Sequence, residues 1–133
     1  MNVKISKGSS TKMNVVYNWN GSKLIKGAAS YGDVLNNFDG TFLREGNGKY
    51  NKVLYNWDGA NIRAGNHKEG NIIYNWKDGK LMKGSYHTAD VVFNWSGGRL
   101  RKGNHLEGEI LFSWDGEIPV PIILIMLIRE GIL

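Results

Sequence analysis

The fold of this chain is decided by a stretch near its middle, Val53-Leu54-Tyr55-Asn56-Trp57-Asp58-Gly59. Its first five residues combine β-branched, aliphatic and aromatic side chains, which is typical of a β-strand. The Asp-Gly pair that follows is a common two-residue hairpin turn, because both positions tolerate a positive φ. We therefore expect a β-hairpin whose first strand ends at Trp57 and whose turn is centred on Asp58 and Gly59.

This motif recurs every 19 residues, as the step from Tyr55 to Tyr74 shows. Its third position is occupied by Tyr17, Asn36, Tyr55, Tyr74, Phe93 and Phe112. Six copies in one register, with no insertion or deletion between them, predict six structural units in a single domain. We expect that domain to span residues 1–133, with half a unit at 1–14, units that begin at 15, 34, 53, 72, 91 and 110, and an apolar C-terminal segment at 117–133.

Alternation along each strand separates an apolar face from a mixed one. Across the expected turn, Val53, Tyr55 and Trp57 share the apolar face with Ala60 and Ile62. Small residues then stand opposite the large aromatic ones, at Ser22, Thr41, Ala60, Gly79 and Gly98. Because a packed core needs such a match of large and small side chains, we expect the tryptophans inside and the Asn and basic residues on a solvated outer face.

Two all-β architectures fit these units. One is a closed antiparallel β-hairpin array of the six repeats, with a first strand, five hairpins and a last strand, which makes a barrel or flower of about twelve strands. The other is a β-solenoid with one repeat in each rung. We favour the closed array, because a solenoid would stack equivalent residues about 4.8 Å apart, and with them the like charges of Arg44 and Arg63 and of Lys83 and Lys102.

The C-terminal run from Ile118 to Ile128 has no polar face, so we expect it to be buried on all sides. A short helix or strand that plugs the middle of the ring would meet this need. Some β-barrels, the tubby-like ones among them, enclose an apolar C-terminal helix, and this segment is similar to that solution. The alternative is an exposed apolar tail for membrane contact or self-assembly. The run contains Pro119 and Pro121 and is too short to span a bilayer as a helix.

Residues 27–40 carry a resemblance to known proteins. They pass from a glycine-rich loop through Val34-Leu35 and the pair Asn37-Phe38 to the turn Asp39-Gly40. This order resembles the unit of small, uncharacterised bacterial proteins built from tandem β-hairpin repeats, and the chain is similar to the bacterial domains called β-flowers. The resemblance covers essentially the whole chain and implies a repeat fold with an apolar final segment. It carries over no function and no functional residue.

Composition and motifs argue against catalysis. The chain has no cysteine, which excludes disulfides, thiolate metal sites and cysteine nucleophiles. We expect His67, His87 and His105 in solvated loops, because no metal-binding or acid–base pattern accompanies them. The chain also lacks a phosphate loop and the Gly-x-Ser-x-Gly motif. We therefore expect no enzyme activity, no cofactor and no metal site.

The Asn residues that recur with the repeat are the best candidates for a binding site. One set stands beside the aromatic residues of the strands, at Asn18, Asn37, Asn56, Asn75 and Asn94. A second set follows the glycines that end the second strands, at Asn47, Asn66 and Asn104. An Asn amide both donates and accepts hydrogen bonds, as sugar hydroxyls require, and equivalent weak sites add avidity for a polymer. We expect a multivalent, lectin-like module that binds glycan chains.

Basic residues support a weaker prediction of polyanion or nucleic-acid binding. The net charge is +5, which attracts polyanions, although a charged surface also serves solubility. The residues that would line a basic surface on the second strands are Lys23, Arg44, Arg63, Lys80, Arg99 and Arg101. Binding through them would weaken steeply as salt is added.

The N-terminus bears on location and on assembly. Residues 1–5 lack the apolar core of a signal peptide, so we expect a cytoplasmic location or export without a cleaved signal. Residues 1–8 begin with a lone strand. If the chain does not close on itself, this strand offers an unpaired edge to the next molecule, and self-assembly into a fibre is the alternative function.

Overall fold

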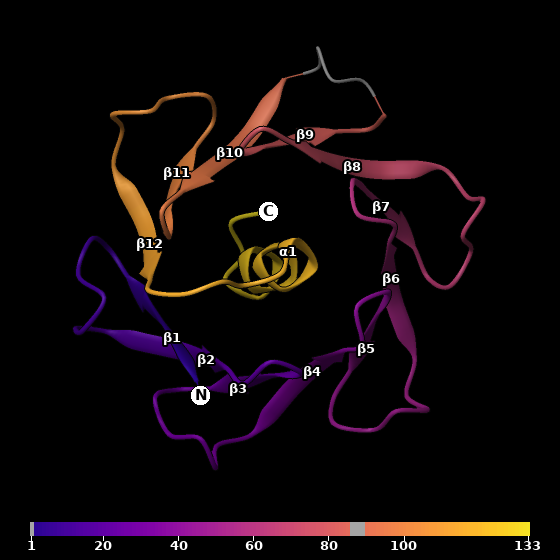
Figure 1. The fold of residues 1–133 in the computed structure, drawn as a ribbon, viewed down its shortest axis with the longest axis horizontal. Coiled ribbons are helices and arrows are strands. Elements are labelled where there is room, and N and C mark those ends of the chain that lie inside the picture. The colour runs from indigo at the N-terminus through magenta and orange to yellow at the C-terminus, as the bar shows by residue number, and fades with distance from the viewer. Residues whose placement is uncertain (1, 86–89) are drawn as a thin grey trace.

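The computed structural model describes residues 2–85 and 90–133, which form a closed β-barrel around one helix (Figure 1). The strands are β1 (Val3–Lys7), β2 (Val15–Trp19), β3 (Lys23–Lys26), β4 (Val34–Phe38), β5 (Phe42–Glu45), β6 (Val53–Trp57), β7 (Asn61–Ala64), β8 (Ile72–Lys77), β9 (Lys80–Lys83), β10 (Val91–Ser96), β11 (Arg99–Lys102) and β12 (Ile110–Trp114). The helix is α1 (Val120–Arg129). The predicted all-β repeat fold is confirmed.

Each strand pairs with its neighbours along the chain, and β1 pairs with β12 to close the ring. Every pairing is antiparallel, as adjacent hairpins require. The closed hairpin array is therefore confirmed, and the solenoid alternative is not what the structure shows. The edge expected for fibre formation is also missing, since β1 has a partner on both sides.

The register across the hairpin turn differs from the prediction by two residues. Trp57 lies opposite Ile62, so Ala60 belongs to the turn and not to the facing strand. The reason is the Asp58 carboxylate, whose Oδ1 accepts hydrogen bonds from the backbone N–H groups of Ala60 and Asn61 at 2.9 and 2.7 Å. This side-chain cap moves the centre of the turn to Gly59 and Ala60. Because the shift is an even number of residues, the predicted faces survive it.

Three layers of side chains line the inside of the barrel. Ile and Leu residues form the middle layer and are fully buried, at Ile5, Leu24, Leu43, Ile62, Leu81 and Leu100. The turn end of the barrel carries Trp19, Phe38, Trp57, Trp76, Trp95 and Trp114. The opposite end carries the third-position residues of the motif, from Tyr17 to Phe112. The expected inward face of the aromatic residues is confirmed.

The sixth unit is assembled from both ends of the chain. Trp114 on β12 lies opposite Ile5 on β1, in the same way that Trp95 lies opposite Leu100 within one hairpin. The half unit at the N-terminus therefore supplies the second strand that the unit at 110 lacks. Asp115-Gly116 repeats the Asp-Gly pair of the hairpin turns, but no second strand follows it, because the chain leaves the wall there and continues to the helix.

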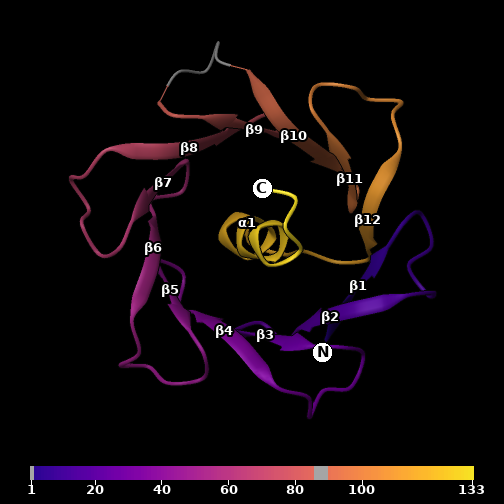
Figure 2. The same cartoon turned by 180° about the vertical axis from the view of Figure 1, so that it is seen from behind.

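Helix α1 fills the barrel and is enclosed by strands on all sides in both views (Figures 1 and 2). Residues from Ile122 to Leu127 are buried, which confirms a buried C-terminal segment and identifies it as a helix. Its end is held by Glu130, which accepts a hydrogen bond from the Tyr17 hydroxyl at 2.6 Å and pairs with Lys7 at 3.0 Å. No helix within residues 2–85 and 90–133 is long and apolar enough to cross a membrane.

Candidate functional site

The loops opposite the hairpin turns radiate from the barrel, and we call them petals (Figure 1). Those that the structure describes in full lie at residues 8–14, 27–33, 46–52, 65–71 and 103–109. All have the same length, because the repeat contains no insertion. Each petal joins the second strand of one hairpin to the first strand of the next. The barrel thus presents equivalent loops at regular intervals around its circumference.

Each fully described petal is fixed at its base by a side chain from the first strand of the same unit, and Asn56 shows the pattern. Its Nδ2 donates hydrogen bonds to the carbonyl oxygens of Gly65 at 2.8 Å and His67 at 3.2 Å. Equivalent bonds run from Asn18 to Gly27 and Ala29, from Asn37 to Gly46 and Gly48, and from Asn94 to Gly103 and His105. Asn75 donates to Gly84, and Ser113 to Gly8 in the N-terminal petal.

These bonds correct the expectation that Asn18, Asn37, Asn56, Asn75 and Asn94 stand on a solvated face. Their side chains leave the barrel on the outer side, as alternation predicts, but the petals fold over them. Asn56 is only 3% exposed, and Asn18, Asn75 and Asn94 are also buried, while Asn37 is partly buried. A buried amide must be hydrogen-bonded, and here the petal backbone satisfies it. This Asn set therefore builds the petals.

Of the six basic residues of the second strands, the four arginines are engaged in contacts with petals and turns. Each of Lys23, Arg44, Arg63, Lys80, Arg99 and Arg101 is partly buried. Arg63 donates from Nε to the carbonyl of Gly70 at 3.0 Å and pairs with Asp58 at 2.8 Å. Arg101 repeats the first contact with Gly108, and Arg44 repeats the second with Asp39. The arginines thus hold petals and turns in place. The sequence pattern predicts them on a solvated surface and does not predict these contacts.

The same contacts control the charge of Asp58. Burial opposes its ionisation, but the hydrogen bonds from Arg63 and from the N–H groups of Ala60 and Asn61 outweigh that effect. Together they hold the pKa of Asp58 well below its ordinary value. The carboxylate is therefore a structural acceptor that stays ionised at neutral pH, and it has no proton to offer in acid–base chemistry.

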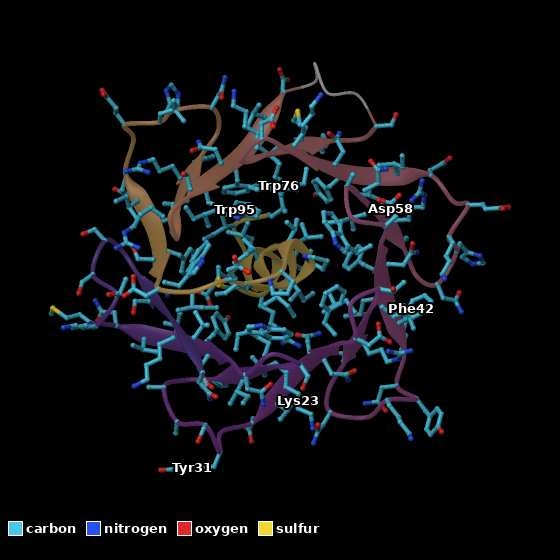
Figure 3. All side chains as sticks on the ribbon, viewed as in Figure 1. Lys23, Tyr31, Phe42, Asp58, Trp76 and Trp95 are labelled. Carbon is cyan, nitrogen blue, oxygen red and sulfur yellow. The ribbon has the colours of Figure 1, made fainter. Side chains whose placement is uncertain are left out.

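Exposed side chains gather instead at the tips of the petals. Tyr31 is 91% exposed and Tyr50 is 89% exposed, and Figure 3 shows Tyr31 pointing away from the barrel. Met13 and Leu106 are also largely exposed on their petals. Asn47, Asn66 and Asn104 are exposed near the petal bases, so the second Asn set is accessible as predicted. Sequence reasoning missed the tyrosines because they fall outside the strand pattern on which it relied.

The histidines that the structure describes lie in petals. His67 and His105 are exposed in two petals of matching sequence, Gly-Asn-His-x-Glu-Gly, and His87 lies outside the described residues. Within the described part of the chain, no three His, Asp or Glu side chains are close enough together to hold a metal ion.

Comparison with known proteins places the chain by its repeat. It has no significant match among the curated proteins and none among the solved structures. A family model described as the 6-fold beta flower protein matches residues 4–123, which contain all twelve strands except the first residue of β1. The β-flower resemblance of the repeat is thereby confirmed, and the chain belongs to the family of six-fold β-flower proteins.

Proposed function

We propose that this protein is a non-enzymatic, multivalent binding module whose petal tips contact a glycan chain. The observation that carries the proposal is the nearly complete exposure of Tyr31 and Tyr50 on adjacent petals. A large aromatic side chain so exposed contributes almost nothing to the core, whereas its face can stack on a sugar ring. The other tyrosines that the structure describes, Tyr17, Tyr55 and Tyr74, are buried or partly buried.

The arrangement of the petals supports contact with a polymer. Because β1 pairs with β12, the petals at 103–109, 8–14, 27–33 and 46–52 are consecutive around the ring. These four carry the exposed Leu106, Met13, Tyr31 and Tyr50. Individually weak contacts on one rigid support act together, since binding of the first raises the effective concentration for the second. A repeating polymer can meet several petals at once, which a small ligand cannot.

Polar groups next to the tips supply what sugar hydroxyls need. Asn47 is exposed on the petal of Tyr50, and Asn66 and Asn104 hold the same position in two other petals. Lys49 lies over the Tyr50 ring, with its Nζ 5.2 Å from the ring centroid. This contact steadies the ring without covering all of it. The second Asn set therefore stays in the proposed site. The strand set, which we call the clamp, supports the petals from below and consists of Asn18, Asn37, Asn56, Asn75 and Asn94.

A glycan array followed by calorimetry tests the proposal. We expect Tyr31→Ala and Tyr50→Ala each to weaken binding about fivefold to tenfold, and the double variant to lose more than either, as stacking on separate petals requires. Lys77→Ala, which changes an exposed residue at the opposite, turn end, is the matched control and should bind normally. A flat array with a correctly folded protein would refute glycan binding, and unchanged affinity of the double variant would refute the petal-tip site.

A further inference from the structure

A concave surface lies at the turn end of the barrel, at the opposite end from the petals. It encloses about 810 Å³ between the hairpin turns and the connector that leads from β12 into α1. The connector crosses from the barrel wall to the helix, so Pro119 and Val120 form one side of the space. Neither the repeat nor the proposed petal contacts account for this pocket.

Tryptophan dominates the lining of the pocket. Trp19, Trp76, Trp95 and Trp114 all contribute to it, each from a different unit. Trp76 and Trp95 stack with their ring centroids 4.0 Å apart and their planes at 26°, and Figure 3 shows both between the strands and the helix. Trp76 is the least buried of the four. Indole faces carry a negative quadrupole, and Trp is the aromatic residue that attracts cations most strongly.

The charged residues of the pocket point to the same class of ligand. Asp115 and Glu117 belong to its lining, which contains no lysine, arginine or histidine, although the whole chain carries a net charge of +5. Asp115 lies 4.0 Å from Arg99, which offsets part of its charge. Glu117 forms no ion pair with any residue within 2–85 and 90–133. An incoming cation therefore meets an uncompensated carboxylate beside the aromatic rings.

We propose that the Trp-lined pocket at the turn end binds a quaternary ammonium group. Such a cation has no N–H to satisfy, which suits a lining that combines four tryptophans with two carboxylates. A primary ammonium would need several acceptors, and an anion would be repelled by Asp115 and Glu117. The group could be part of free choline, of phosphocholine or of a trimethyllysine side chain, because all three present the same trimethylammonium head.

Tryptophan fluorescence gives a direct test, since the lining itself is the reporter. The protein is titrated at constant ionic strength with choline, phosphocholine, N-trimethyllysine and the neutral isostere 3,3-dimethyl-1-butanol. We expect saturable binding of at least one cation with a Kd at least tenfold lower than that of the isostere, and the tightest of the three identifies the source. Equal binding of the isostere, or no saturable signal from any cation, would overturn the proposal.

Two pairs of variants locate the site. Glu117→Gln should weaken binding of the cation at least threefold, while Glu109→Gln, which removes the same charge from a petal, should leave it unchanged. Trp76→Leu should abolish binding, whereas Trp57→Leu changes a comparably half-buried tryptophan outside the lining and should not. Because Glu117 is exposed, its variant remains informative even if Trp76→Leu fails to fold. Equal effects within both pairs would refute the location.

Discussion

Replacing Asn56 by alanine removes the side chain that holds the petal at 65–71 to the barrel. The amide is 3% exposed and donates to two carbonyl oxygens, at 2.8 Å to Gly65 and at 3.2 Å to His67. Each neutral hydrogen bond contributes about 1 kcal/mol net, and a buried acceptor left without a donor costs about 1–3 kcal/mol. The petal borders solvent, so water reaches part of the vacated site. We therefore expect a total loss of about 2–3 kcal/mol in the free energy of unfolding.

Equilibrium unfolding in urea measures this loss, and hydrogen exchange shows where it arises. The backbone N–H groups of Gly65 and Gly70 are bonded to Leu54 and His67 at the base and tip of this petal, so their exchange should accelerate more than that of core amides. Asn66→Ala is the matched control, because Asn66 is exposed in the same petal and its loss should cost at most about 0.5 kcal/mol.

The comparison separates support from binding. If Asn56→Ala cost no more than the control, the clamp would not be what orders the petal. If Asn56→Ala lowered the glycan affinity while Tyr31 and Tyr50 stayed as exposed as in the wild type, the buried Asn would be a ligand contact after all. We expect instead a protein that is less stable and, once folded, binds through its other petals.

Three further predictions concern the frame of the barrel. Gly98→Ala should lower the free energy of unfolding by more than about 3 kcal/mol or prevent folding, because the added Cβ would overlap the carbonyl oxygen of Trp114. Gly97→Ala is the control, since Gly97 also has a positive φ but lies in open space, and thermal melts should show a loss of about 1 kcal/mol. Deleting residues 1–7 removes β1, so circular dichroism melts should lose their cooperative transition, and a stably folded deletion variant would contradict ring closure. The lowered pKa of Asp58 contributes stability that is complete above the unfolded pKa of about 3.9 and is lost as pH falls through the folded pKa. In urea unfolding, the difference in free energy of unfolding between the wild type and Asp58→Asn should therefore be largest at neutral pH and should shrink below about pH 4.

The sequence was sufficient for the repeat, the strands and their faces because all three follow from periodicity. A step of 19 residues with alternating side chains has few solutions, and the aromatic residues on the inner face follow from it. The centre of the turn was less determined. Asp-Gly fits the two central positions, but it also fits a turn in which the Asp58 carboxylate caps the N–H groups that follow. Local propensity alone does not choose between these, since both place Trp57 on the same face.

The candidate site was harder to predict because it depends on a loop that folds back. Alternation placed Asn56 correctly on the outer side of its strand, and an outer side chain is ordinarily solvated. The petal at 65–71 covers it, and nothing in the strand pattern encodes the path of that loop. Tyr31 and Tyr50 were missed for a related reason. They share one repeat position, 19 residues apart, but that position holds Lys12, Glu69 and Glu107 in other petals, so a search for residues common to all repeats passes over them.

The clamp explains why petals with different tips share one shape. Asn37 and Asn56 donate to backbone carbonyl oxygens, which every petal offers. The first of the two carbonyls belongs to glycine in both petals, whereas the second belongs to Gly48 in one petal and to His67 in the other. The tips are therefore free to change without loss of the fold, as long as the residue after the second strand accepts the positive φ seen at Gly46 and Gly65. Stability resides in the barrel and the clamp, and recognition can be placed petal by petal. On this reasoning the identity of a petal ligand is encoded in the exposed residues of each petal, and the buried strand Asn beneath it says nothing about that ligand.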